Sequence, residues 1–351
     1  MRLAIVGAGY GLQAHLPAFR SINGVSVDVV INTGTSKANL NLPEGVRYSA
    51  FLEEALSTKI DAVCIAVPPA LQMNLALEVL GANKHLLCEK PFGMSAFETH
   101  RIFAKAKDSS QLVVAVNFQY RFEPMIQALR DLIRTGRLGR LQWIDIEWLT
   151  AGGANSSRTW TWRNSASDGG GALRAFACHV IDLVIWLTSQ KVKTTTADTQ
   201  ILIPKRPHGD TGTERQVTAE DLVVAQLQLD ECVAHIRITN CQPGGRGMKI
   251  EVGGSHGVAV LRNKPPYERQ TLEVFGLNEG ISQWSAAIGT GETSADTRVP
   301  ALSALASAFY AAVTGFTPID LPRVGDAYAV QSVMQAVYES SRLGRTIPVN
   351  G

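Results

Sequence analysis

The sequence predicts an α/β protein whose first third forms a doubly wound parallel sheet and whose remainder is built on an antiparallel sheet. Three observations lead to this fold class. An apolar run near the N-terminus enters a glycine-rich turn, strand-like and helix-like segments then alternate, and the second half changes to an apolar and polar alternation with period two. A chain of 351 residues is expected to hold about two domains, which we place at residues 1–122 and 123–351.

The opening segment, residues 3–15, has the order of strand, turn and helix that receives a dinucleotide pyrophosphate. In such a turn the first glycine makes the bend, the second lets the phosphates approach the backbone, and the helix N-terminus attracts the anion. A third glycine is expected at position 12, which is a leucine here, and Gly11 comes one residue early. A buried turn that binds nothing is the alternative. The expected cofactor contacts are Gly7, Gly9, Tyr10, Gly11 and Leu12.

The second predicted strand, residues 25–31, should end beside the adenine ribose. An NAD site places an Asp or Glu there to accept the 2′-hydroxyl, about 20 residues after the glycines. This sequence has Asn32 at that place, followed by hydroxyl side chains and a lysine without a carboxylate. We therefore expect NADP to be favoured over NAD, with contacts from Asn32, Thr33, Ser36 and Lys37. A polar loop with an N-capping serine or threonine is the alternative interpretation.

Helices and strands continue to alternate after this loop. We expect a helix near residues 50–56, a strand at 62–67 and a helix through 71–79. Strands that alternate with helices of this length indicate a parallel sheet. Two further cofactor contacts are expected where the strand at 62–67 ends: Val67 and Pro68.

The strand that starts at His85 ends in Glu89-Lys90-Pro91. It delivers a lysine to the carboxyl edge of the sheet, where ligands of such folds bind. Pro91 favours an extended conformation of Lys90. A solvated lysine at a strand end is the alternative for Lys90 taken alone. Ser95 and Glu98 then have the spacing of a capping box for the next helix.

The second half begins with a helix between Pro124 and Gly136. Apolar residues alternate with polar ones at 234–239 and 248–252, as in strands with one buried face. Residues 204–218 are polar and predict a long loop. After the three glycines at 169–171, the sequence predicts a helix with an apolar face that contains His179, which taken alone is a core residue.

The composition argues against several classes of protein. Hydrophobic residues make up 45% of the chain, charged residues 18%, and the formal net charge is +2, so neither disorder nor a polyanion-binding surface is indicated. We expect no nucleic-acid or membrane partner, since no run of about 18 apolar residues is present, and the N-terminus leaves no room for a signal peptide. Five scattered cysteines and scattered histidines favour a cytoplasmic protein without disulfides or a metal site.

Several of these segments together resemble one protein family. The Gly-x-Gly turn with His15 behind it, the strand end at 88–91, the segment 117–122 and the segment from Gly169 through His179 are similar to the glucose-fructose oxidoreductase / inositol dehydrogenase (Gfo/Idh/MocA) family. Glu-Lys-Pro is the strongest single marker, and the resemblance runs in order over nearly the whole chain. It implies a Rossmann domain followed by an α/β domain with a large open antiparallel sheet, and NAD- or NADP-dependent oxidation or reduction of sugars, polyols and their derivatives.

The resemblance also implies partners and site residues. It implies a homo-oligomer, a dimer or tetramer, in which the exposed sheet face often forms an interface, although a solvated face accounts equally well for the charges here. It implies Lys90 and His179 as catalytic residues. The cofactor contacts it adds are Glu89, Lys90, Pro91 and Asn117. The expected substrate contacts are Lys90, Tyr120, Arg121, Trp162, Arg163, Arg174 and His179, although Arg163 and Arg174 could be structural ion-pair partners.

One position departs from the family pattern. Relatives place an Asp four residues before the histidine, where it can orient the imidazole, and this chain has Ala175 there. Asp182 could substitute, although we expect it to be an ordinary surface aspartate. Two hypotheses follow: an oxidoreductase in which Lys90 stabilises charge on the reacting oxygen while His179 moves the proton, or a cofactor-binding sensor or scaffold that lost turnover.

Overall fold

The computed structural model describes residues 1–351 except 33–41, 210–211, 264–268, 277–279, 288–297 and 351. The chain divides into two compact units. Unit 1 is Met1–Phe122 with Gly291–Tyr328, and unit 2 is Glu123–Thr290 with Ala329–Gly351. The expected assignment of all residues after 122 to the second domain therefore differs from the structure, because residues 291–328 group with unit 1.

Unit 1 is built on a six-stranded parallel sheet with strand order β3-β2-β1-β4-β5-β6. This order is that of a dinucleotide-binding Rossmann fold, and it confirms the predicted fold class. The central strands read as continuous apolar runs because both of their faces are covered. The strands are β1 Arg2–Val6, β2 Ser26–Ile31, β3 Arg47–Ser49, β4 Ala62–Ile65, β5 His85–Cys88 and β6 Val114–Val116.

Helices and short helical turns connect these strands. They are the π-helical turn η1 Gly11–His15, α1 Leu16–Arg20, the 3₁₀ turn η2 Leu52–Glu54, α2 Pro69–Gly81, α3 Ala96–Asp108 and the 3₁₀ turn η3 Gln119–Phe122. The helix expected near 50–56 is wrong, because only the 3₁₀ turn η2 forms there. The predicted cap of α3 is confirmed, since the Ser95 hydroxyl accepts the Glu98 backbone N–H at 3.3 Å.

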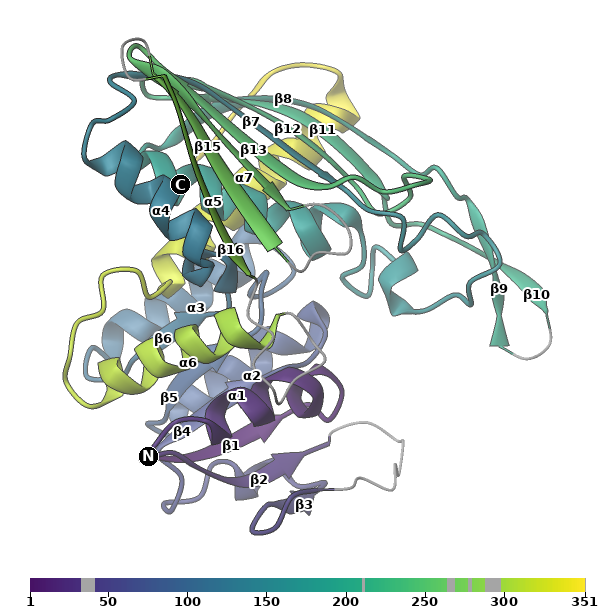
Figure 1. The fold of residues 1–351 in the computed structure, drawn as a ribbon. Helices are drawn as coiled ribbons and strands as arrows, with labels where there is room; N and C mark the ends of the chain where they lie inside the picture. The colour runs from purple at the N-terminus through teal and green to yellow at the C-terminus, as the bar shows by residue number, and fades with distance from the viewer. Residues whose placement is uncertain (33–41, 210–211, 264–268, 277–279, 288–297, 351) are drawn as a thin grey trace. The chain divides into compact units, whose positions relative to one another are not determined.

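A segment from far along the sequence completes the core of unit 1. Helix α6, Val299–Val313, packs beside α1 (Figure 1). Phe309 of α6 meets Phe19 of α1 edge to face at 6.4 Å, and both side chains are fully buried with Leu305. This packing is the physical reason why the segment belongs to unit 1 although it follows most of unit 2 in sequence.

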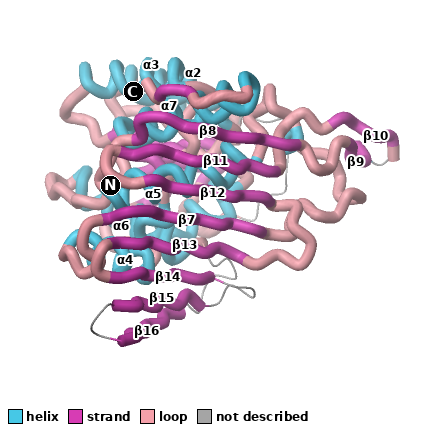
Figure 2. Tube along the Cα trace, turned by 90° about the horizontal axis from the view of Figure 1, so that it is seen from above, coloured by secondary structure: helices cyan, strands magenta, loops and turns pink. Residues whose placement is uncertain are grey.

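Unit 2 is built on a nine-stranded sheet with strand order β16-β15-β14-β13-β7-β12-β11-β8-β17 (Figure 2). Among the described strands, neighbours run antiparallel except β7 and β12, which are parallel, so the expected antiparallel sheet is a mixed one. The strands are β7 Leu141–Leu149, β8 Val192–Gln200, β11 Leu222–Leu229, β12 Val233–Thr239, β13 Gly247–Gly254, β14 Gly257–Asn263, β15 Arg269–Gly276, β16 Gly280–Ala287 and β17 Ile347–Pro348.

Helices of unit 2 cover one face of this sheet. Helix α4, Pro124–Arg134, packs on β14 and β15, and α5, Cys178–Thr188, packs on β7. The long helix α7, Val324–Leu343, begins in unit 1 and continues in unit 2, where the Ser340 hydroxyl accepts the Ala197 N–H of β8 at 2.9 Å. The period-two pattern reflects this one-sided cover, because the side chains toward the helices are buried and their neighbours are exposed.

The loop expected at 204–218 is wrong in part. The structure has a two-stranded hairpin there, with β9 Lys205–His208 paired to β10 Thr213–Gln216. The Arg215 guanidinium lies 3.5 Å from the centroid of the Trp160 ring, and the Trp160 indole N–H donates to the Gln216 carbonyl at 3.1 Å. These contacts from a distant tryptophan stabilise strands whose own composition does not indicate them.

No helix in the described ranges combines the length and the apolar character that crossing a bilayer requires.

Candidate functional site

The glycine-rich turn of unit 1 leaves its backbone open to a ligand. Gly7 follows β1 with φ +118°, and a Cβ there would lie 2.3 Å from the Ala66 carbonyl oxygen, so only glycine fits. A Cβ on Gly9 would meet nothing within 4 Å, and the residue is exposed. The backbone at the start of the following helix is therefore accessible, as a phosphate site requires.

The early third glycine is explained by the helix that follows. A Cβ on Gly11 would come within 2.8 Å of the Ile5 Cγ2 atom, so Gly11 allows the close contact of helix and strand that the third glycine of the pattern normally provides. Residues 11–15 form a π-helical turn, which holds one residue more than an α turn. Leu12 lies on this turn and Tyr10 directly precedes it, and both are partly buried.

The next two segments at the carboxyl edge are joined by one buried glutamine. Gln72 donates its side-chain N–H to the Val67 carbonyl at 3.1 Å and accepts the Gly93 backbone N–H at 2.8 Å. Gln72 has no exposed surface. It thereby fixes the segment of Val67 and Pro68, after β4, against the segment that follows Lys90 and Pro91, after β5.

A buried polar cluster lies directly after β5. Glu89 Oε1 is 2.7 Å from His15 Nε2 and accepts the Asn117 side-chain N–H at 2.5 Å. Burial alone would lower the pKa of His15, but its contacts with Cys64 and Glu89 raise it to about 10. Burial alone would raise the pKa of Glu89, but His15, Lys90 and Asn117 hold it below its usual value. His15 and Glu89 therefore form a buried ion pair.

Asn117, the first residue after β6, carries a buried acceptor. Its side-chain nitrogen donates to Glu89 and, at 3.1 Å, to Gln119 Oε1. Its Oδ1 has no hydrogen-bond partner among the described residues although the side chain is 1% exposed. Since a buried amide oxygen normally has a donor, this atom fits a ligand that carries an N–H group, such as the carboxamide of a nicotinamide.

Lys90 is half-buried between two anchored residues. Glu89 before it lies in the buried cluster, and Phe92 after it has no exposed surface. The Phe92 carbonyl accepts the Thr99 hydroxyl at 2.7 Å. The backbone on both sides of Lys90 is thus held in place, which keeps this residue at the carboxyl edge of the sheet. The Lys90–Pro91 peptide bond is cis.

The other residues expected to bind in unit 1 have different surroundings. Asn32 follows β2 as expected, and its N–H donates to the Ser49 carbonyl at 3.0 Å. Thr33, Ser36 and Lys37 lie outside the described residues. Tyr120 and Arg121 are in η3, where Arg121 is buried and forms an ion pair with Asp326 at 3.0 Å. This pairing gives Arg121 a structural contact, and its substrate role stays a prediction.

In unit 2, a buried carboxylate holds the start of the helix that carries His179. The helix begins with a π-helical turn, η5 Leu173–Ala177, and continues as α5. Glu220 Oε1 accepts the Leu173 N–H at 2.9 Å and the Tyr338 hydroxyl at 3.2 Å. A Cβ on Gly171 would lie 2.3 Å from Glu220 Oε1, so the glycine makes room for this cap. Burial raises the pKa of Glu220 despite the hydrogen bond from Leu173.

His179 lies in the core of unit 2. The residue is 6% exposed, and its ring centroid is 6.4 Å from that of Trp148 on β7. Asp182, on the same helix, is 1% exposed, so the expectation of a surface aspartate is wrong. Helix α5 is apolar almost all round and is covered on most sides, so even its one carboxylate is buried.

The expected arginine and tryptophan contacts of unit 2 lie on two different helical turns, η4 Trp162–Asn164 and η5. Arg174 donates to the Tyr338 hydroxyl at 3.0 Å and lies over that ring, which gives it a structural contact. Trp162 and Arg163 are in the 3₁₀ turn η4, where the exposed Arg163 stacks on Trp162 at 4.8 Å. Their substrate roles stay predictions.

Within unit 1, the structure brings the predicted cofactor residues together at the carboxyl ends of adjacent parallel strands. These residues are Gly7, Gly9, Asn32, Val67, Pro68, Glu89, Lys90, Pro91 and Asn117. Sequence reasoning did not assign site roles to His15, Gln72, Gln119 or Glu220. Their signal is burial combined with polarity, which only the structure reveals.

Comparisons with known proteins agree with this arrangement. Residues 1–118 match the family described as "Oxidoreductase family, NAD-binding Rossmann fold", and residues 126–260 match the GFO/IDH/MocA C-terminal domain. An uncharacterized oxidoreductase of Synechocystis is 33% identical over 266 residues, which cover 74% of this chain and 71% of that protein.

Two further comparisons concern levoglucosan dehydrogenases. The enzyme of Pseudarthrobacter phenanthrenivorans is 27% identical over 226 residues, which cover 60% of this chain and 56% of that protein. A solved levoglucosan dehydrogenase in complex with NADH and levoglucosan superposes with a TM-score of 0.86 at 22% identity, covering 100% of this chain and 99% of that one. At 22% identity, this structural similarity shows a shared fold.

Proposed function

The chain belongs to the Gfo/Idh/MocA oxidoreductase family, and from that premise we propose that it transfers hydride between a nicotinamide cofactor and a secondary alcohol or ketone of a sugar, polyol or sugar derivative. The observation that carries the proposal is Lys90, which is anchored at the same carboxyl edge of a Rossmann sheet as an open glycine turn. A relative named as a levoglucosan dehydrogenase supports the substrate class.

When bound, the oxidised nicotinamide would accept a hydride from the alcohol carbon. In the oxidising direction, the Lys90 ammonium would donate a hydrogen bond to the reacting oxygen and stabilise the negative charge that develops on it. His179 would take the hydroxyl proton as general base, and in reduction it would return that proton to the oxygen. Glu89, Asn117 and the glycine turn would hold the cofactor.

A substrate screen tests this proposal. Sugars, sugar phosphates, nucleotide sugars and inositols are offered with NAD and NADP, and the absorbance of the reduced nicotinamide is followed. Turnover of one or more of these compounds is expected. Cofactor binding without turnover on any of them would favour the alternative, a sensor or scaffold, to which the alanine at position 175 also points.

We also propose that NADP is preferred over NAD. The sequence from 32 to 37 offers amide, hydroxyl and ammonium groups with no carboxylate to repel a 2′-phosphate. NADP should bind about 10-fold tighter than NAD in calorimetric titrations, as expected when one charged contact is gained. Lys37→Ala should weaken NADP binding and leave NAD binding nearly unchanged. Equal affinities for both cofactors in the unaltered protein would refute the preference.

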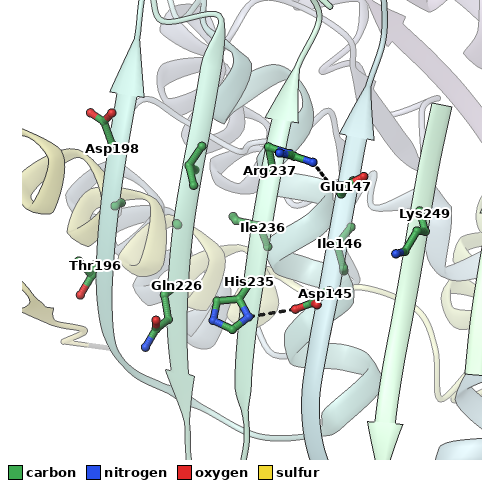
Figure 3. Close-up of a pocket in the computed structure, with 13 residues that line it drawn as sticks. Asp145, Ile146, Glu147, Thr196, Asp198, Gln226, His235, Ile236, Arg237 and Lys249 are labelled. Atoms are coloured by element: carbon green, nitrogen blue, oxygen red, sulfur yellow. Dashed lines mark hydrogen bonds and ion pairs between the residues drawn. The ribbon is translucent and has the colours of Figure 1, made fainter. Parts of the chain in front are cut away.

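We further propose that two copies of the chain meet through the open face of the unit 2 sheet. Side chains on this face alternate in charge across neighbouring strands: Arg237 pairs with Glu147, and His235 lies 2.9 Å from Asp145 (Figure 3). Lys249 continues this pattern on β13 (Figure 3). A surface with both signs interleaved can complement its own two-fold copy.

Charge reversal tests this interface. Arg237→Glu should raise the dissociation constant of the dimer about 10-fold or more, because it places like charges next to Glu147 and across the interface. Analytical ultracentrifugation would measure the constant, and Lys59→Glu, an exposed change in unit 1, is the matched control. A monomeric wild-type protein, or a variant that dimerises unchanged, would leave this face as a solvated one.

A further inference from the structure

The buried polar cluster next to Lys90 contains a histidine that has no role in the proposed reaction. His15 has no exposed surface, and it lies on the π-helical turn that follows the glycines. Its Nε2 faces Glu89 Oε1 at 2.7 Å, and its Nδ1 faces the Cys64 sulfur at 3.3 Å. The two ring nitrogens thus have separate partners, one on β4 and one directly after β5.

The same carboxylate oxygen that faces His15 also fixes an amide. Glu89 Oε1 accepts the Asn117 side-chain N–H at 2.5 Å, and Gln119 Oε1 accepts from the same nitrogen at 3.1 Å. The orientation of Gln119 is itself fixed, because its nitrogen donates to the Arg298 carbonyl at 3.3 Å. With two acceptors around the Asn117 nitrogen, the Asn117 oxygen must point the other way.

Glu89 needs His15 to serve as an acceptor. A carboxylate that is only 8% exposed is costly unless donors compensate for its lost hydration. His15 supplies a donor at short range, and the other titratable groups that face the pair are the Lys90 ammonium and the thiols of Cys64 and Cys88. Without His15, Glu89 would take up a proton or turn away, and the Asn117 amide would lose the contact that orients it.

We propose that His15 is a positioning residue for the nicotinamide carboxamide: it holds Glu89 as an acceptor, Glu89 fixes the Asn117 amide, and Asn117 Oδ1 accepts a carboxamide N–H. This inference rests on the proposed binding of a nicotinamide cofactor. The buried Asn117 Oδ1, which has no partner among the described residues, is the atom left for that N–H.

A matched pair of dinucleotides reads out this single hydrogen bond. NAD and 3-acetylpyridine adenine dinucleotide share every group except the carboxamide, which a methyl ketone without N–H donors replaces in the second. Wild-type protein should bind NAD about 5- to 10-fold tighter than the analogue in calorimetric titrations, the range for one buried hydrogen bond. Asn117→Ala should bind the two with equal affinity.

Two substitutions of His15 distinguish the contribution of Nε2 from that of Nδ1. Glutamine places its side-chain N–H near the position of Nε2, and asparagine places its own near Nδ1. His15→Gln should therefore keep the preference for NAD, whereas His15→Asn should lose it although residue 15 does not touch the cofactor. A general loss of packing would affect both variants alike, and thermal unfolding of each checks that it is folded.

The outcomes decide between this inference and the proposed function. Retention of the preference in Asn117→Ala or in folded His15→Asn, or its loss in His15→Gln, would overturn the role of His15. Should His15→Asn not fold, His15→Gln and Asn117→Ala still decide. A wild-type protein that prefers NAD over the analogue but oxidises no substrate would refute the oxidoreductase proposal and leave this inference standing.

Discussion

Replacing Lys90 by methionine should lower kcat by a factor of about 100 or more while the affinity for the cofactor stays nearly unchanged. Methionine keeps the length and the apolar stem of the side chain but removes the ammonium. The proposed contact with the reacting oxygen strengthens as negative charge develops, so its loss falls on the transition state. Steady-state kinetics on a substrate found in the screen, together with calorimetric titration of the cofactor, measure both quantities.

A second lysine variant provides the control for this prediction. Lys59 is exposed and precedes β4, at the opposite end of the parallel strands from Lys90. Lys59→Met makes the same chemical change and should leave both kcat and cofactor affinity unaltered. A Lys90→Met enzyme with a rate near that of wild type would show that Lys90 is a solvated lysine at a strand end.

The fold of unit 1 could be predicted because its signals are local. Apolar runs such as 62–65, the glycines at 7, 9 and 11, and the Ser95 cap each act within a few residues of themselves. The helix expected near 50–56 was wrong because period alone does not distinguish a full helix from a single 3₁₀ turn. The place of residues 299–313 in unit 1 depends on contacts with Phe19, about 290 residues away, which no local pattern encodes.

The candidate site could be predicted only in part. Lys90 and Asn117 follow strands, so the rule that ligands bind at the carboxyl ends of parallel strands places them correctly. The interactions that orient them come from residues far apart in sequence: His15 and Glu89 are separated by 74 positions, and no local pattern indicates their pairing. The burial of Asp182 was missed for the same reason, since a single carboxylate on a helix normally faces water.

Removal of the His179 imidazole is the companion test for the second unit. His179→Ala should lower kcat/KM for alcohol oxidation by about 100-fold or more, because a general base contributes on that order. His256→Ala, an exposed histidine between β13 and β14, is the control and should retain full activity. Full activity of His179→Ala would show that the histidine is a core residue and that another group moves the proton.

Restoring a carboxylate at position 175 should shift the pH profile of alcohol oxidation to higher pH. Ala175 lies one helical turn before His179, and a negative charge there favours the imidazolium form, so Ala175→Asp should raise the pKa of the base by about 1 unit or more. A base acts when it is unprotonated, and therefore the acidic limb of kcat/KM moves upward with that pKa. Ala175→Asn introduces a side chain of the same size as aspartate but without the charge, and it should leave the acidic limb in place.

Asp182→Asn tests the carboxylate that is already present three residues after His179 on the same helix. A downward shift of the acidic limb in this variant would show that the buried Asp182 carboxylate already acts on His179. An Ala175→Asp profile identical to that of wild type, with His179→Ala inactive, would show that His179 is essential but does not titrate as the base.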